Sequence, residues 1–144
     1  MTDAEAMQLR ARAIKEVLDD RGRGIVSRWV EKELTNVDQA NIEARFNQIE
    51  LNQTENPKWV KYYKSLKMWE IRLSSSGKAL RFLCEKEVNQ DVILLVGCVK
   101  RGQISGTATA QAKERRDLYR KGKLNVRDYP LPQRPPVDVE KSRR

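Results

Sequence analysis

The fold of this chain is decided by residues 68–99, MWEIRLSSSGKALRFLCEKEVNQDVILLVGCV. Apolar and polar side chains alternate on both sides of the turn residues 76–77, which is the pattern of two strands that each bury one face. After a second turn at 89–90, residues 92–99 form a nearly unbroken apolar run, as expected for a central strand covered on both sides. The stretch therefore predicts a three-stranded antiparallel meander.

The turn also predicts the register. A two-residue loop at 76–77 sets Leu73 opposite Leu80 and Arg72 opposite Arg81, so one face of the hairpin is apolar. The other face is predicted to gather charged side chains: Glu70, Arg72, Arg81 and Lys100, with Arg101 just past the strand end. Adjacent cations repel one another unless an anion joins them, and phosphate is a natural anion. The alternative is a solvated face on which Glu70 simply pairs with an arginine.

The rest of the chain predicts mainly helices. Helical spacing of apolar residues indicates helices over 2–20, 38–52 and 107–121. Residues 25–34 fit either a helix or a strand, and their β-branched and aromatic content favours a strand. The predicted class is α+β. The predicted organisation is an N-terminal helical extension at 1–23, a domain at 24–122 and a Pro-rich, flexible tail at 123–144.

The composition is strongly basic. The chain has 144 residues, with 29 Lys plus Arg against 20 Asp plus Glu, and a formal net charge of +9. Residues 57–104 and 105–144 each carry a net +6, whereas residues 24–56 carry −3. A concentrated basic region is the electrostatic footprint of a polyanion-binding protein. Lysines and aromatic side chains that alternate there are predicted to contact RNA: Lys64, Lys67, Lys78, Trp69 and Tyr63. The alternative is a basic surface without a partner.

Several classes of chemistry are excluded by what the chain lacks. It contains no His, which removes catalytic triads and the common histidine metal sites. Cys84 and Cys98 are the two cysteines, and their spacing fits no zinc motif. We therefore expect no metal and no cofactor. Since no apolar stretch approaches the length of a membrane span, we expect a cytoplasmic protein without membrane contact.

Three stretches carry a family resemblance: residues 63–73 (YKSLKMWEIRL), 80–83 (LRFL) and 92–102 (VILLVGCVKRG). Together they resemble the RelE/ParE superfamily of toxins, particularly its HigB-like, phage-derived branch, over residues 25–121. The resemblance implies a RelE-like fold in which helices pack on one face of a mostly antiparallel sheet. It also implies a type II toxin that cleaves mRNA on the ribosome and is held inactive by a cognate antitoxin, expected to be acidic and to contain a helix-turn-helix.

The catalytic positions of the resembled family carry over to Arg72, Arg81 and either Lys100 or Arg101. This chain has Glu70 where the RelE pattern has a lysine, and no tyrosine near Thr107 where that pattern has one. Glu70 can accept the proton of an RNA 2′-hydroxyl or serve only as an ion-pair partner. The other function class that fits the basic face is a non-catalytic module, either a ParE-like gyrase poison or a phage RNA-binding protein.

Overall fold

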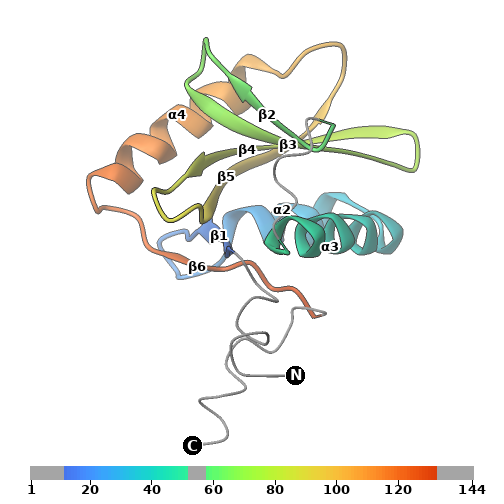
Figure 1. The fold of residues 1–144 in the computed structure, drawn as a ribbon, viewed down its shortest axis with the longest axis horizontal. Helices are drawn as coiled ribbons and strands as arrows, with labels where there is room; N and C mark the ends of the chain where they lie inside the picture. The colour runs from blue at the N-terminus through green and yellow to red at the C-terminus, as the bar shows by residue number, and fades with distance from the viewer. Residues whose placement is uncertain (1–11, 52–57, 133–144) are drawn as a thin grey trace, which may run out of the picture.

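The computed structural model describes residues 12–51 and 58–132. These residues form a six-stranded, mostly antiparallel open sheet and three helices (Figure 1). The elements in chain order are β1 (Ile14–Val17), α2 (Ile25–Glu33), α3 (Asn36–Glu50), β2 (Val60–Tyr63), β3 (Met68–Ser75), β4 (Lys78–Lys86), β5 (Val92–Lys100), α4 (Gly106–Arg120) and β6 (Val126–Asp128). The strand order is β2-β3-β4-β5-β1-β6. The predicted α+β class is therefore confirmed.

The meander of β3, β4 and β5 has the predicted register. Leu73 pairs with Leu80 and Arg72 with Arg81. Ser76 and Gly77 form the loop, and both have positive φ, as a tight turn that follows the strand twist requires. A bulge opposite Leu83 and Cys84 shifts the β4–β5 register by one residue beyond that point, on the side away from the arginines.

The first face of the sheet is covered by α2 and α3. Its core contains Ile71 and Leu73 of β3 and Leu80 and Phe82 of β4, all buried, with Phe46 of α3 packed edge-on against Phe82. These residues occupy alternate strand positions, so their burial follows directly from the period-two pattern. The apolar face predicted from the sequence is confirmed.

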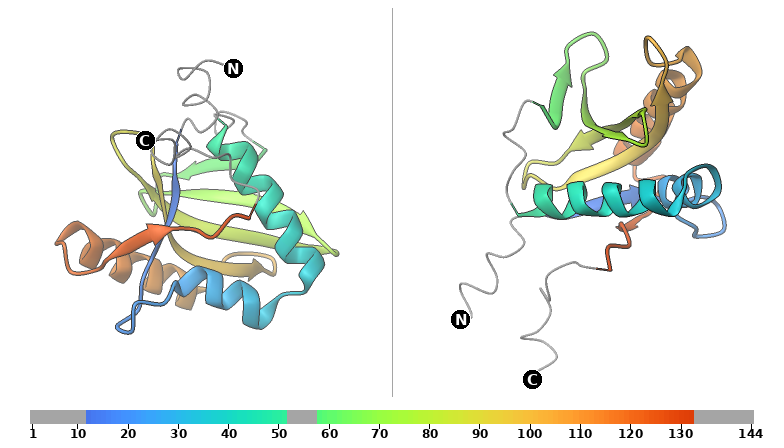
Figure 2. Two further views of the ribbon diagram at one scale, coloured as in Figure 1. Left: turned by 90° about the horizontal axis from the view of Figure 1, so that it is seen from below. Right: turned by 90° about the vertical axis from the view of Figure 1, so that its right-hand side faces the viewer.

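The second face is covered by α4, so the prediction that the helices pack on one face is wrong. Ala108 and Ala112 of α4 are buried with Leu83, Ile93 and other apolar residues of the sheet. Figure 2 shows α2 and α3 on one side of the sheet and α4 on the other. The physical reason is the continuous apolar run of β5, which exposes hydrophobic side chains on both faces and needs cover on both.

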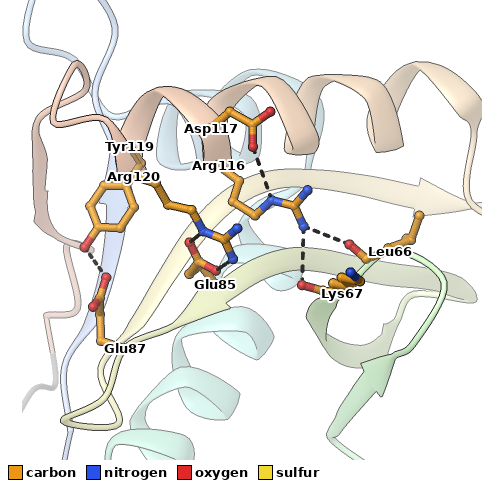
Figure 3. A network of polar contacts seen from close by, with 8 residues as sticks. All are labelled: Leu66, Lys67, Glu85, Glu87, Arg116, Asp117, Tyr119 and Arg120. Carbon is orange, nitrogen blue, oxygen red and sulfur yellow. Dashed lines mark hydrogen bonds and ion pairs between the residues drawn. The ribbon is translucent and has the colours of Figure 1, made fainter.

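Polar contacts hold the C-terminal half of α4 to the sheet (Figure 3). Arg116 Nη1 donates to the Leu66 carbonyl at 2.8 Å and to the Lys67 carbonyl at 3.3 Å, in the turn between β2 and β3. Arg120 Nε donates to Glu85 at 2.8 Å, and the Tyr119 hydroxyl donates to Glu87. The helix therefore spans the second face from its alanines to the β2–β3 turn.

Two predicted elements are wrong. Residues 14–17 of the predicted N-terminal helix form β1, which pairs in parallel with β5 and antiparallel with β6; residues 2–11 lie outside the described residues. Residues 25–33 form a helix rather than the favoured strand, with Val26 and Val30 buried one turn apart. In both segments tertiary contacts decide the structure: strand pairing for 14–17 and burial of one helix face for 25–33. The intrinsic preference of these residues for helix over strand differs by only a few tenths of a kcal/mol per residue, which is too little to decide it.

The helices predicted over 38–52 and 107–121 are confirmed as α3 and α4 with slightly different ends. The N-cap of α3 is Thr35, whose side chain accepts from the Asp38 backbone in a capping box. After α4, β6 joins the same sheet, and Tyr129 and Leu131 are buried. Residues on both sides of the expected boundaries at 24 and 122 thus share one sheet, while the tail beyond 132 lies outside the described residues.

A buried polar network ties the β3–β4 hairpin to the start of α3. Asp38 has no exposed surface and pairs with Lys78. Ser75 Oγ donates to Asp38 at 2.6 Å and accepts from Asn41 at 2.8 Å. Lys78 and the Ser75 hydroxyl hold the pKa of Asp38 well below its usual value of 3.8, although burial acts in the opposite direction. The network therefore stabilises the fold while Asp38 is ionised.

We expect Lys78→Met to lower the melting temperature at pH 7. Because the pKa of Asp38 is lower in the folded than in the unfolded protein, its contribution to stability is complete above the unfolded value and is lost as the pH falls toward the folded value. The difference from wild type should therefore be complete at neutral pH and shrink below about pH 4. Circular dichroism melts between pH 7 and pH 2 measure this. The exposed Lys61 provides the control, since Lys61→Met removes a charge without touching Asp38. A Lys78→Met deficit that stayed constant down to pH 2 would contradict the assigned role.

Candidate nucleic-acid interface

Three charged side chains meet on the second face, where β3 lies beside β4. Glu70 has no exposed surface, and its Oε1 lies 3.1 Å from Arg72 Nε and 3.5 Å from Arg81 Nε. The Arg81 side chain is 12% exposed, and its Nη1 donates to the Leu80 carbonyl at 2.8 Å. One buried carboxylate thus holds two guanidinium groups side by side and leaves one positive charge uncompensated.

Two further groups act on Glu70 from the same face. Burial raises the pKa of the Glu70 carboxyl, while Arg81, Arg72, the Tyr63 hydroxyl and Lys100 act in the opposite direction. The pKa of Tyr63 is itself raised by burial and by the Glu70 carboxylate. Lys100 pairs with Ala79, two positions before Arg81, which places it on the face that the register predicts. The structure therefore brings together four of the five predicted catalytic residues.

The fifth, Arg101, lies just past the end of β5. It is exposed and forms an isolated bridge with Gln103. Cys98 lies opposite Arg81, and burial raises the pKa of its thiol. Cys84 lies on the first face in the core, and both cysteines are free thiols. Cys98 packs with the residues of the second face, so the two thiols lie on opposite faces of the sheet.

A cleft of about 320 Å³ opens beside the two arginines. The pairing of β2 with β3 ends at Ile71, so the remaining edge of β3 has no neighbouring strand among the described residues. This edge cleft is lined by Arg45, Lys58, Trp59, Arg72, Leu73, Ser74 and Arg81. Four of its lining residues are cationic and none is acidic. A cleft of this composition attracts anions.

Arg45 reaches the edge cleft from α3. Its Cζ lies 4.5 Å from the centroid of the Trp59 ring, and its Nη1 donates to the Arg72 carbonyl. The Arg72 backbone N–H donates in turn to the Trp59 carbonyl at 2.7 Å. The Arg45 guanidinium group therefore donates to the Arg72 carbonyl in place of a backbone N–H from a neighbouring strand. Arg72, one of the two paired arginines, thus fixes Arg45 through its backbone.

Comparison with known families agrees with this architecture. Residues 32–117, more than half of the chain, match the family described as phage derived protein Gp49-like (DUF891). The chain belongs to the Gp49-like family. This family is toxin-like and lies in the RelE/HigB-type toxin group, so the resemblance seen in the sequence is confirmed at the level of that group. No curated protein and no solved structure matches the chain.

The Gp49-like match begins near the end of α2 and runs into α4, so it includes every residue of the Glu70–Arg72–Arg81 cluster and of the edge cleft. Within residues 12–51 and 58–132, no group of three or more His, Cys, Asp or Glu side chains is arranged to hold a metal ion. No helix in these ranges combines the length and the apolar composition needed to cross a bilayer.

The predicted RNA contacts are spread over several places in this Gp49-like chain. Tyr63 lies on the second face beside Glu70. Lys64 and Lys67 are exposed in the β2–β3 turn, near the end of α4. Trp69 lies on the first face, where Lys86 Nζ is 4.4 Å from its ring centroid, and Lys78 pairs with Asp38. Of the five predicted RNA contacts, only Tyr63 therefore lies on the same face as the paired arginines and interacts electrostatically with them.

Sequence reasoning missed two residues of the edge cleft, Arg45 and Lys58. One signal was present, because Arg45 is the only basic residue of α3, which is otherwise neutral or acidic. Its neighbour Phe46 is a buried core residue, which orients the helix against the sheet. Where Arg45 reaches the β3 edge depends on the packing of α3, and no local pattern encodes that position.

Proposed function

We propose that this Gp49-like protein is the toxin of a type II toxin–antitoxin pair, and that it inhibits translation as a ribosome-dependent mRNA endonuclease in the cytoplasm. The observation that carries the proposal is the pair of guanidinium groups, Arg72 and Arg81, held by a buried carboxylate next to a cationic cleft. Membership of a toxin-like family supports it.

The proposed reaction is attack of an RNA 2′-hydroxyl on the adjacent phosphorus. The new P–O2′ bond forms a 2′,3′-cyclic phosphate, and the P–O5′ bond breaks. The 2′-hydroxyl loses a proton, and the departing 5′-oxygen gains one. Arg72 and Arg81 stabilise the charge that accumulates on the phosphate oxygens, since arginine stays charged and donates in a fixed fork.

Glu70 has two possible roles in this reaction. As a counter-ion it fixes both guanidinium groups before substrate binds, which agrees with its complete burial. As a general base it would accept the 2′-hydroxyl proton; its raised pKa favours this role, whereas its complete burial does not. Lys100 and Arg101 are proposed to assist the leaving group, and Tyr63 offers a hydroxyl on the same face.

The proposed partner is an acidic antitoxin that contains a helix-turn-helix and covers or distorts the cationic face. The chain has a net charge of +9, and its basic side chains are concentrated after residue 57. An acidic partner is therefore attracted electrostatically, and one that covers Arg72 and Arg81 excludes RNA from them.

The test is expression of the chain alone, with primer extension on the cellular mRNA. We expect growth arrest and new 5′ ends within translated codons. Purified protein should cut mRNA on programmed ribosomes and leave naked mRNA largely intact, because the ribosome positions the message for the reaction. Intact mRNA on ribosomes, in the presence of folded protein, would overturn the proposal. DNA breaks in the arrested cells would instead support the gyrase-poison alternative.

A further inference from the structure

The edge cleft continues from the paired arginines toward α3, and nothing in the proposed reaction yet uses its outer half. Its volume of about 320 Å³ lies at the lower end of the range for ligand-binding clefts, about 300–1,000 Å³. It has an aromatic wall, Trp59, and a rim that includes Lys58 and Ser74. The combination of cations with an indole and no acidic residue suits a nucleotide better than it suits a purely acidic group.

The Arg45–Trp59 pair has the composition of a base-stacking platform. The guanidinium plane and the indole lie 4.5 Å apart, from Arg45 Cζ to the ring centroid, and Arg45 is held in place through the Arg72 carbonyl. Arg45 Nε is buried and has no hydrogen-bond acceptor among the described residues. A buried guanidinium donor without an acceptor is costly, so Arg45 retains donor capacity that no described residue satisfies.

We infer that the edge cleft binds one nucleotide of single-stranded RNA directly beside the scissile phosphate, with its base stacked on the Arg45–Trp59 pair. This inference rests on the proposed function for the position of the scissile phosphate. Bases of RNA stack on aromatic rings and on arginine planes, and such stacking tolerates different bases. Arg72 contributes to both subsites, because its side chain faces Glu70 while its backbone carbonyl holds Arg45.

The experiment compares three variants in the full chain: Trp59→Leu, which removes stacking; Trp59→Phe, which keeps an aromatic ring; and Tyr62→Leu. Tyr62 is the matched control, because it is an exposed aromatic residue of the adjacent β2 that packs against Trp69 on the first face. Two measurements are made on each: kcat and KM for mRNA on programmed ribosomes, and the Kd of a fluorescent single-stranded RNA hexamer from anisotropy in low salt.

We expect Trp59→Leu to raise the hexamer Kd and the ribosomal KM by about 5- to 150-fold, the range for loss of one stacked base. Trp59→Phe should restore both the Kd and the KM most of the way to their wild-type values, and Tyr62→Leu should have the wild-type Kd and KM. Melting temperatures are measured alongside. If Trp59→Leu does not fold, Lys58→Gln, at an exposed position on the rim, is used instead with an expected several-fold rise in Kd.

The outcomes separate this inference from the proposed function. If Trp59→Leu raises the hexamer Kd but the wild-type protein leaves mRNA uncut, the proposed endonuclease activity is overturned and the nucleotide site stands. A folded Trp59→Leu variant with unchanged Kd and KM would overturn the nucleotide site and keep the endonuclease. A Trp59→Leu variant that cuts mRNA at the wild-type rate but is no longer inhibited by the antitoxin would also overturn the inference. The cleft would then bind the antitoxin and not RNA.

Discussion

Arg81→Ala is expected to abolish growth arrest and to reduce mRNA cleavage on ribosomes by about 10²- to 10³-fold, the usual cost of one preorganised donor to a developing charge. The Arg81 side chain faces Glu70 and lies opposite Arg72 across the hairpin, away from the apolar first face. Truncation therefore removes a phosphate contact and leaves the packing of the core intact. Colony formation after induction and single-turnover cleavage measure the effect.

The same substitution has a stability cost that a solvated arginine would not have. Arg81 is largely buried and lowers the pKa of Glu70, so its loss leaves the carboxylate with fewer compensating charges. Arg81→Lys separates the two effects, since it keeps the charge and loses the planar fork. We expect it to melt near the wild-type temperature and still cleave slowly.

Arg28→Ala is the matched control for Arg81→Ala. Arg28 is exposed on α2, outside the edge cleft, so the variant loses the same unit of charge far from the paired arginines. It should retain growth arrest. Full toxicity of both Arg81→Ala and Arg81→Lys, with unchanged melting temperatures, would show that Arg81 is an ordinary sheet residue and that the active-site assignment is wrong.

The part of the fold that the sequence predicts correctly is governed by local rules. A two-residue turn at Ser76 and Gly77 fixes the hairpin register, and a slip by one residue would place arginines in the core. The pairing of Arg72 with Arg81 follows from that register alone. The central part of the candidate site was therefore predictable without any knowledge of the helices.

The remaining part depends on contacts between distant segments. Four residues, Ile14–Val17, are too few for periodicity to separate a helix from a strand, and they become β1 because both β5 and β6 offer backbone partners. The side chosen by α4 depends on which face of β5 remains uncovered. The edge cleft needs α3 and the β3 edge together, so Arg45 and Trp59 were not predictable as neighbours.

Glu16 of β1 is expected to be the most sensitive polar residue for stability. It has no exposed surface, and its carboxylate accepts from Ser27 N at 2.8 Å, from Ser27 Oγ at 2.7 Å and from Arg127 Nε at 3.2 Å. The N-cap of α2 is Gly24, which offers no side chain for capping. Glu16 therefore caps α2 from a different element, and its negative charge lies at the positive end of the helix.

Glu16→Ala removes this cap and leaves the half-buried Ser27 N–H and hydroxyl without the Glu16 carboxylate as acceptor. We expect it to lower the free energy of unfolding by about 2–4 kcal/mol, from the loss of a cap and of hydrogen bonds to a charged group. For a chain of this length that corresponds to a fall in Tm of roughly 10 °C. Glu31→Ala, which removes an exposed carboxylate from the same helix, should change Tm by little.

A double-mutant cycle with Gly24 makes this prediction specific. A Cβ at Gly24 would lie 2.1 Å from Glu16 Oε2, so Gly24→Ala should destabilise the wild-type protein by displacing the carboxylate from Ser27. In the Glu16→Ala background the obstructing atoms are gone, and the same substitution should cost much less. Chemical denaturation of the four proteins gives the coupling free energy. Additive effects, or a Glu16→Ala variant that melts with wild type, would show that the carboxylate does not cap α2 in solution.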